Sequence, residues 1–158
     1  MTEQLSFTMR ALEAGLLSDL ADQLTELVEQ GSDADPARSR LTPQAYPDDR
    51  SASAEFQRLT AGDLHAQRVS DAACVRERVH EALLGEPDDD TEVVITLDEA
   101  QTESWIRTLS ALRLVLSVRL GITADDSHQP GEEPYGLYDW LGYRLDLLIE
   151  AADARDGF

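Results

Sequence analysis

The spacing of hydrophobic positions changes early in the chain. Within residues 4–9 every second side chain is apolar, which is the period of a short half-buried strand. Over residues 12–28 the apolar side chains recur every three or four positions, and acidic side chains occupy the opposite arc. The pattern therefore predicts a strand near residues 4–9, followed by an amphipathic helix that ends near Gly31 in a left-handed cap.

A second strand and helix are predicted in the other half of the chain. Residues 92–97 are rich in β-branched side chains, which favour a strand. Asp98 is a suitable N-cap for the helix that follows, and Gly121 marks the end of this helix. An isolated short strand is unstable without a partner. We therefore expect the two predicted strands to pair with each other.

The remaining segments are predicted to be helices joined by polar linkers. A short helix near residues 52–59, a longer one near 61–84 and a final helix from Pro134 to about Ala152 are expected. Three polar linkers are expected near 31–37, 85–91 and 123–133. The predicted fold is a mostly α single domain over residues 1–158, with four to five helices and one small two-stranded sheet.

Composition narrows the classes of function. The chain has 158 residues, of which 42% are apolar, and a formal net charge of −19. All 13 basic residues are arginine, which excludes a P-loop lysine and a Schiff-base lysine. The negative charge disfavours direct binding to nucleic acid. We expect neither a signal peptide nor a membrane span, and the sequence indicates a cytoplasmic protein.

The basic residues are concentrated in the central third of the chain. Residues 38–78 contain seven arginines and six acidic residues, whereas the rest of the chain contains six arginines and 26 acidic residues. Two interpretations stay open. The arginines form internal ion pairs, or they line a patch that contacts an acidic surface of a partner protein.

Three segments of the chain carry a family resemblance. The first comprises Arg40-Leu41, Pro43, Ala45-Tyr46, Asp48-Asp49, Glu55-Phe56, Arg58-Leu59-Thr60 and Leu64; the second Thr96-Leu97-Asp98-Glu99, Trp105, Leu109, Leu112-Arg113-Leu114 and Arg119-Leu120-Gly121-Ile122; the third Tyr138-Asp139-Trp140-Leu141-Gly142. In these segments the chain resembles an actinobacterial family of unknown function, commonly encoded near the Clp protease adaptor ClpS and partly named for AosR-like oxidative-stress transcriptional regulators. The resemblance implies a regulator that contacts transcription or stress machinery and is not an enzyme.

Candidate site residues fall into three groups. The candidates for partner binding are Arg40, Tyr46, Arg50, Phe56, Arg58, Trp140 and Tyr143. The candidates for structural salt bridges are Arg113 and Arg119, with Asp48, Asp49, Glu55 and Asp139 as the expected carboxylates. Cys74 is a redox candidate that cannot form an internal disulfide, because it is the one cysteine of the chain. Arg78 lies one helical turn beyond Cys74 and could lower the pKa of its thiol.

Three further hypotheses stay open. Trp140 and Tyr143 point away from the predicted core face of the last helix, which allows a homodimer contact or a second internal packing surface. Gene order in the resembling family suggests an accessory factor linked to Clp proteolysis. An enzyme with a carboxylate site around Asp48, Asp49 and Glu55 is a third hypothesis. No metal site and no cofactor are predicted, and a sigma factor or a polymerase surface is the partner that the resemblance implies.

Overall fold

The computed structural model describes residues 4–32, 34–41, 50–122 and 135–155, and of residues 50–61 it describes the backbone only. The elements follow the order β1 (Leu5–Arg10), α1 (Ala11–Gln30), α2 (Pro36–Arg40), α3 (Arg50–Ala82), β2 (Glu92–Leu97), α4 (Glu99–Leu120) and α5 (Gly136–Arg155). This arrangement confirms the predicted fold class, a mostly helical protein with one two-stranded sheet.

The two strands pair with each other, as their isolation in the sequence predicted. They are antiparallel, with Leu5 opposite Leu97 and Phe7 opposite Ile95. Leu5, Ile95 and Leu97 are buried, whereas Val94 on the other face of β2 is 59% exposed. The Phe7 ring meets the indole of a buried tryptophan of α4 edge to face, with 5.6 Å between the ring centroids. One face of the sheet therefore closes the core.

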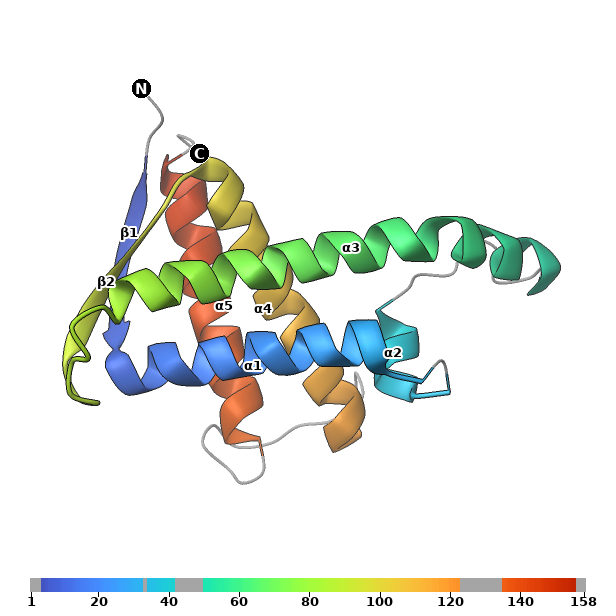
Figure 1. The fold of residues 1–158 in the computed structure, drawn as a ribbon, viewed down its shortest axis with the longest axis horizontal. Helices are drawn as coiled ribbons and strands as arrows, with labels where there is room; N and C mark the ends of the chain where they lie inside the picture. Colours follow the sequence, from blue (N-terminus) through green and yellow to red (C-terminus); the bar gives the residue numbers. More distant parts are fainter. Residues whose placement is uncertain (1–3, 33, 42–49, 123–134, 156–158) are drawn as a thin grey trace.

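The helices form two crossing layers. Helices α1 and α3 lie side by side, and α4 and α5 cross behind them, with the sheet at one end of the molecule (Figure 1). Apolar side chains from α1, α3, α4 and α5 meet in the core, and the largest of them is Trp105, which is 1% exposed. The core side chains include Leu17, Leu24 and Val28 of α1, Val75 and Val79 of α3, Leu109 and Leu112 of α4, and Leu141 and Leu148 of α5.

The two predicted helix ends at glycine differ in their geometry. Gly121 ends α4 in the left-handed region at φ 70°, as predicted. Gly31 ends α1 in an extended conformation at φ −69°, so the left-handed cap expected there is wrong. A Cβ atom at position 31 would lie 2.3 Å from the Leu27 carbonyl oxygen and 2.8 Å from Cδ of Arg38. Glycine is required here because Arg38 crosses close to the helix end, where its guanidinium donates hydrogen bonds to the carbonyls of Leu27 and Val28.

Two helical segments, α3 and α2, differ from the sequence prediction. Helix α3 runs unbroken from Arg50 to Ala82, where two helices were expected. Gly62 inside it costs about 1 kcal/mol relative to alanine, which is too little to interrupt a helix whose C-terminal half packs on the core. Helix α2 lies partly within the predicted 31–37 linker. Asp35 caps it by accepting a hydrogen bond from the Ala37 amide at 2.9 Å, and Pro36 occupies the first turn.

Candidate interaction site

An open groove of about 310 Å³ lies between α3 and α4 and combines apolar with charged side chains. Its apolar lining is formed by Leu64 of α3 with Ile106, Ala111 and Leu114 of α4. Its polar lining consists of Gln67, Arg68, Asp71, Arg107 and Ser110. We refer to this feature as the α3–α4 groove. An open surface that mixes apolar area with fixed charges is suited to contact with another protein.

A buried carboxylate holds a guanidinium at the edge of the α3–α4 groove. Asp71 is 2% exposed and accepts two hydrogen bonds from Arg107, at 2.8 and 3.0 Å. Gln67 donates a further hydrogen bond to the same carboxylate at 3.0 Å. The hydrogen bond with Asp71 raises the pKa of Arg107. Since the Arg107 side chain is still 47% exposed, the pair presents a cation in a fixed orientation to the solvent.

The sequence pattern contains a signal for Asp71, although Asp71 is not among the predicted site residues. Asp71 is one helical turn before Val75 and two turns before Val79, so all three lie on one face of α3. Because Val75 and Val79 are fully buried, an acid in the same stripe must be paired. The pattern identifies the buried acid but not Arg107 as its partner.

Arg68 lines the groove on the α3 side and is partly withdrawn from solvent. Burial lowers its pKa, while the charge of Asp71 opposes this shift. Its Nη2 atom donates a hydrogen bond to the carbonyl oxygen of Leu41 at 2.7 Å. Its buried Nε atom has no hydrogen-bond partner among the described residues. Arg68 therefore fixes the chain at Leu41, the residue before the undescribed stretch 42–49, next to the groove.

The other described arginines of the central segment make internal contacts, with one exposed exception. Arg38 binds the end of α1, Arg76 pairs with Asp22 at 2.6 Å, and Arg78 pairs with Glu81. Arg40 is exposed on α2. The side chains of Arg50 and Arg58 lie outside the described residues. In the described part, the structure therefore favours internal pairing over a shared arginine face, the two alternatives that the sequence left open.

The two aromatic candidates on α5 have different surroundings. The Trp140 indole donates a hydrogen bond to Glu13 Oε2 at 2.6 Å and packs against the core, so its contacts are intramolecular. Tyr143 is 60% exposed. Tyr46 and the side chain of Phe56 lie outside the described residues.

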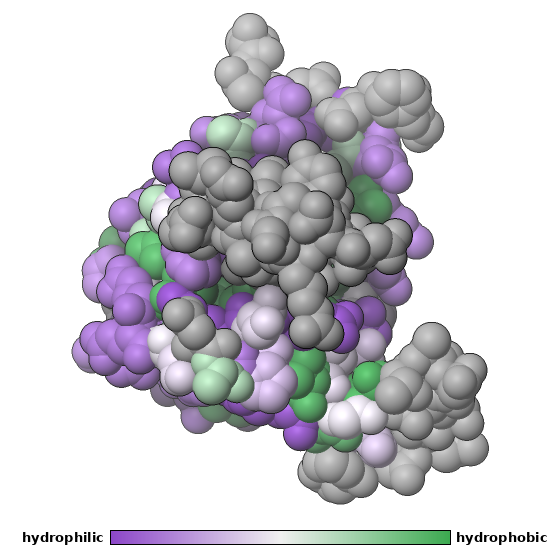
Figure 2. All heavy atoms as spheres, turned by 90° about the vertical axis from the view of Figure 1, so that its right-hand side faces the viewer, coloured by the Kyte–Doolittle hydropathy of each residue, from purple (hydrophilic) through white to green (hydrophobic). Residues whose placement is uncertain are grey.

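Figure 2 shows that the described surface on the side near α2 is mostly hydrophilic, with small hydrophobic areas between the polar ones.

Arg119 forms an ion pair, but with a carboxylate that the sequence did not suggest. Its guanidinium donates two hydrogen bonds to Asp35, at 2.7 and 2.8 Å. The pair ties the N-cap of α2 to the last turn of α4. The hydrogen bonds from Arg119 hold the pKa of Asp35 at about 2. The expected partners Asp48 and Asp49, and the side chain of Glu55, lie outside the described residues.

The Asp35–Arg119 pair predicts a pH dependence of stability. Because the folded pKa of Asp35 is below its ordinary value of 3.8, the pair stabilises the fold above pH 3.8 and loses this contribution as the pH falls towards 2. We expect Arg119→Gln to lower the urea midpoint at about pH 5, and the difference from the wild type to shrink as the pH approaches 2. A difference that is constant over this range would contradict the role of the pair.

Arg113 lies against an aromatic ring. Its guanidinium carbon is 4.1 Å from the centroid of the Tyr138 ring, and its Nε atom donates a long hydrogen bond to the Tyr138 carbonyl at 3.4 Å. The guanidinium also covers Gly142, where a Cβ atom would lie 2.8 Å from it. Glycine at this position thus lets Arg113 approach α5 closely. Asp139, the expected carboxylate partner, is on the same helix, and the structure gives no ion pair between it and Arg113 within the part of the chain that it describes.

Cys74 is half-buried on α3 and packs against the core. Burial raises the pKa of its thiol, and this effect outweighs the opposing charge of Arg78. Arg78 is itself paired with Glu81. The arginine one turn away therefore does not produce the lowered pKa that a reactive thiol needs.

We expect Cys74 to react slowly with thiol reagents in the folded protein. Its raised pKa reduces the fraction of thiolate, and its partial burial reduces access. Reaction with Ellman's reagent at about pH 8 should be at least about tenfold slower in the native protein than in urea. Equal rates in the two conditions would show that the thiol is accessible and ionised in the fold.

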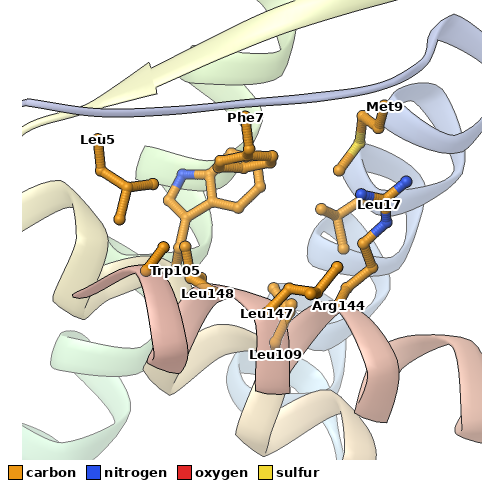
Figure 3. Close-up of a pocket in the computed structure, with 10 residues that line it drawn as sticks. Leu5, Phe7, Met9, Leu17, Trp105, Leu109, Arg144, Leu147 and Leu148 are labelled. Carbon is orange, nitrogen blue, oxygen red and sulfur yellow. The ribbon is translucent and has the colours of Figure 1, made fainter. Parts of the chain in front are cut away.

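A small apolar cavity of about 50 Å³ lies between the sheet and α5. Figure 3 shows Phe7 above Trp105, with Leu147 and Leu148 of α5 below and Arg144 reaching towards Met9. The volume is far below the several hundred Å³ of typical ligand pockets. This cavity is a packing defect beside Trp105 and does not qualify as a substrate site.

Two other kinds of feature are absent from the described residues. In that part of the chain, no three His, Cys, Asp or Glu side chains are grouped so that they could hold a metal ion. None of the described helices combines the length and the apolar character needed to cross a membrane. The α3–α4 groove is the candidate interaction site, because it combines an apolar lining with the Asp71–Arg107 ion pair.

A family model described as Domain of unknown function (DUF2017) matches residues 1–152. No curated protein and no solved structure shows significant similarity to the chain. The matched range includes all three segments on which the resemblance rests.

Proposed function

Since this chain belongs to the DUF2017 family of unknown function, we propose its function from the site: it is a non-enzymatic regulatory protein that acts through contacts with other proteins. The observation that carries the proposal is the α3–α4 groove, where Asp71 holds the half-exposed guanidinium of Arg107 beside an apolar lining. Arginine in a fixed orientation next to apolar surface is typical of protein interfaces.

We further propose that the partner belongs to the transcription machinery. The resemblance to AosR-like oxidative-stress regulators supports this, and it suggests a sigma factor or a polymerase surface in the cytoplasm as the target. The net charge of −19 also supports a protein partner, because such a surface repels the phosphates of DNA. The slow reaction expected of Cys74 implies that an oxidative signal would reach the complex by a route other than this thiol.

Affinity capture from a lysate of the native host, with and without peroxide, tests the proposal. Ser110 is exposed and lines the groove, so Ser110→Trp would obstruct the groove without disturbing the core. Ser70 is exposed on α3 and is not part of the groove lining, so Ser70→Trp is the matched control. We expect the wild type and Ser70→Trp to capture a sigma factor or polymerase subunits, and Ser110→Trp to lose them.

Other outcomes of this experiment would favour a different function or a different contact surface. Capture of Clp components in place of transcription proteins would favour an accessory factor for Clp proteolysis. Equal capture by Ser110→Trp and the wild type would show that the α3–α4 groove is not the contact surface. If peroxide changes capture, we expect the variant Cys74→Ser to show the same change, because partial burial and a raised pKa slow the reaction of this thiol.

A further inference from the structure

A second groove, here called the α1 groove, lies between the first turns of α1 and the segment that follows α3. It is open, has a volume of about 450 Å³, and is lined on one side by Leu12, Gly15 and Leu16 and on the other by Leu83 and Pro87. It is separate from the α3–α4 groove, because the two share no lining residue.

Backbone hydrogen bonds hold the two sides of the α1 groove together. The Ala11 amide donates to the carbonyl of Thr91 at 2.8 Å, and the Leu12 amide donates to the carbonyl of Asp89 at 3.1 Å. The Glu86 amide donates to the carbonyl of Leu83 at 3.0 Å. The groove is therefore already formed in the isolated chain, and a ligand would not have to order it.

The apolar side of the groove is shaped to receive a helix. Leu12 and Leu16 are 51% and 41% exposed, and their spacing of four residues forms a ridge along α1. Gly15 lines the groove beside this ridge, and a Cβ atom built on it would meet nothing within 4 Å. A glycine beside a ridge of exposed leucines allows the backbone of a second helix to approach closely while its apolar side chains pack against the leucines.

The polar rim of the groove is acidic. Asp19 lies on the α1 side, and Glu86 and Asp89 lie on the opposite side. Glu86, at the groove edge, has a φ of 50°, which is unusual for a residue other than glycine. A second copy of this chain would bring the same carboxylates against each other, whereas lysine and arginine side chains would complement them.

We propose that the α1 groove binds a basic amphipathic helix of a partner protein. Leucine-like side chains of that helix would enter between Leu12 and Leu16, and its basic side chains would flank the carboxylates of Asp19 and Glu86. The biological meaning of this inference rests on the proposed regulatory function. Its test uses a model peptide, so that its failure is distinguishable from a failure to capture a transcription partner.

The probe is a fluorescein-labelled helical peptide of about 18 residues, with leucine at i, i+3, i+4 and i+7 spacing and lysine elsewhere. Its binding is followed by fluorescence anisotropy in about 0.15 M NaCl. We expect Gly15→Leu, which fills the groove with a better helix former, to weaken binding at least about tenfold. Val94→Gln on β2 is the control, because Val94 is exposed and lines neither groove, and it should change binding less than about twofold.

A charge variant provides the second measurement. The double variant Asp19→Asn with Glu86→Gln should weaken binding and reduce its dependence on salt, whether or not Gly15→Leu folds well. Equal binding by the wild type, Gly15→Leu and the double variant would overturn the proposal, because the attraction would then be non-specific. Equal affinity for a peptide with glutamate in place of lysine would also overturn it. So would a dimer that Gly15→Leu dissociates, since the groove would then belong to a second copy.

Discussion

Replacing Trp105 with alanine is expected to lower the free energy of unfolding by about 4 kcal/mol. Trp105 is 1% exposed, and its ring packs against Phe7 of β1. The removed volume would join the existing cavity of about 50 Å³ beside it, so the surrounding side chains could not close the space. Since domains of this size are stable by about 5–15 kcal/mol, the loss is a large part of the total. Urea unfolding followed by far-UV circular dichroism measures it.

Two further variants define the origin of this effect. The indole Nε1 of Trp105 has no hydrogen-bond partner among the described residues, so Trp105→Phe loses volume but no hydrogen bond and should cost clearly less, about 1–2 kcal/mol. Tyr143→Ala removes an aromatic ring that is 60% exposed and should stay within about 0.5 kcal/mol of the wild type. A cost below about 1 kcal/mol for Trp105→Ala would contradict the position of this ring at the centre of the core.

Periodicity predicted most of the elements of this fold. The alternation around Phe7 and the β-branched run around Ile95 predicted both strands, and their pairing followed because no other strand was expected. Asp98 and Gly121 predicted the two ends of α4. The pattern failed in α3, which it divides into helices near 52–59 and 61–84, although the helix is continuous from Arg50 to Ala82. It also passed over α2, although Asp35 before a proline is a helix start.

The partners of the charged residues could not be predicted from the sequence. A periodic pattern shows which face of a helix is buried, but not which element covers that face. Asp71 pairs with Arg107 across 36 residues, and Asp35 pairs with Arg119 across 84. Which residues meet over such sequence separations depends on how the helices cross. An arginine side chain is also long enough to reach several different neighbours. The acidic rim of the α1 groove has the same origin, because it joins the start of α1 to the turn after α3.

A cluster of contacts between residues far apart in the sequence is centred on Glu13, at the start of α1. Its carboxylate accepts hydrogen bonds from the Arg10 amide at 3.1 Å, from the Trp140 indole at 2.6 Å and from Arg144 at 3.3 Å. Arg144 also donates to the carbonyl oxygen of Thr8 at 3.1 Å. Glu13 thereby joins the end of β1 and the start of α1 to α5, and its side chain is only 16% exposed.

We expect Glu13→Ala to lower the free energy of unfolding by about 3 kcal/mol, because the Trp140 indole and the Arg144 guanidinium would lose their acceptor in a poorly hydrated place. Burial raises the pKa of Glu13, but the hydrogen bonds and the charge of Arg144 outweigh it and the net pKa is lowered. The stabilisation is therefore complete above pH 4.5 and is lost as the pH falls below it, so the difference between wild type and Glu13→Gln should shrink on acidification. Urea titrations between about pH 6 and pH 3 measure both effects. Glu26→Ala, at an exposed position of the same helix, is the control, and an equal cost for the two alanine variants would contradict the role of Glu13.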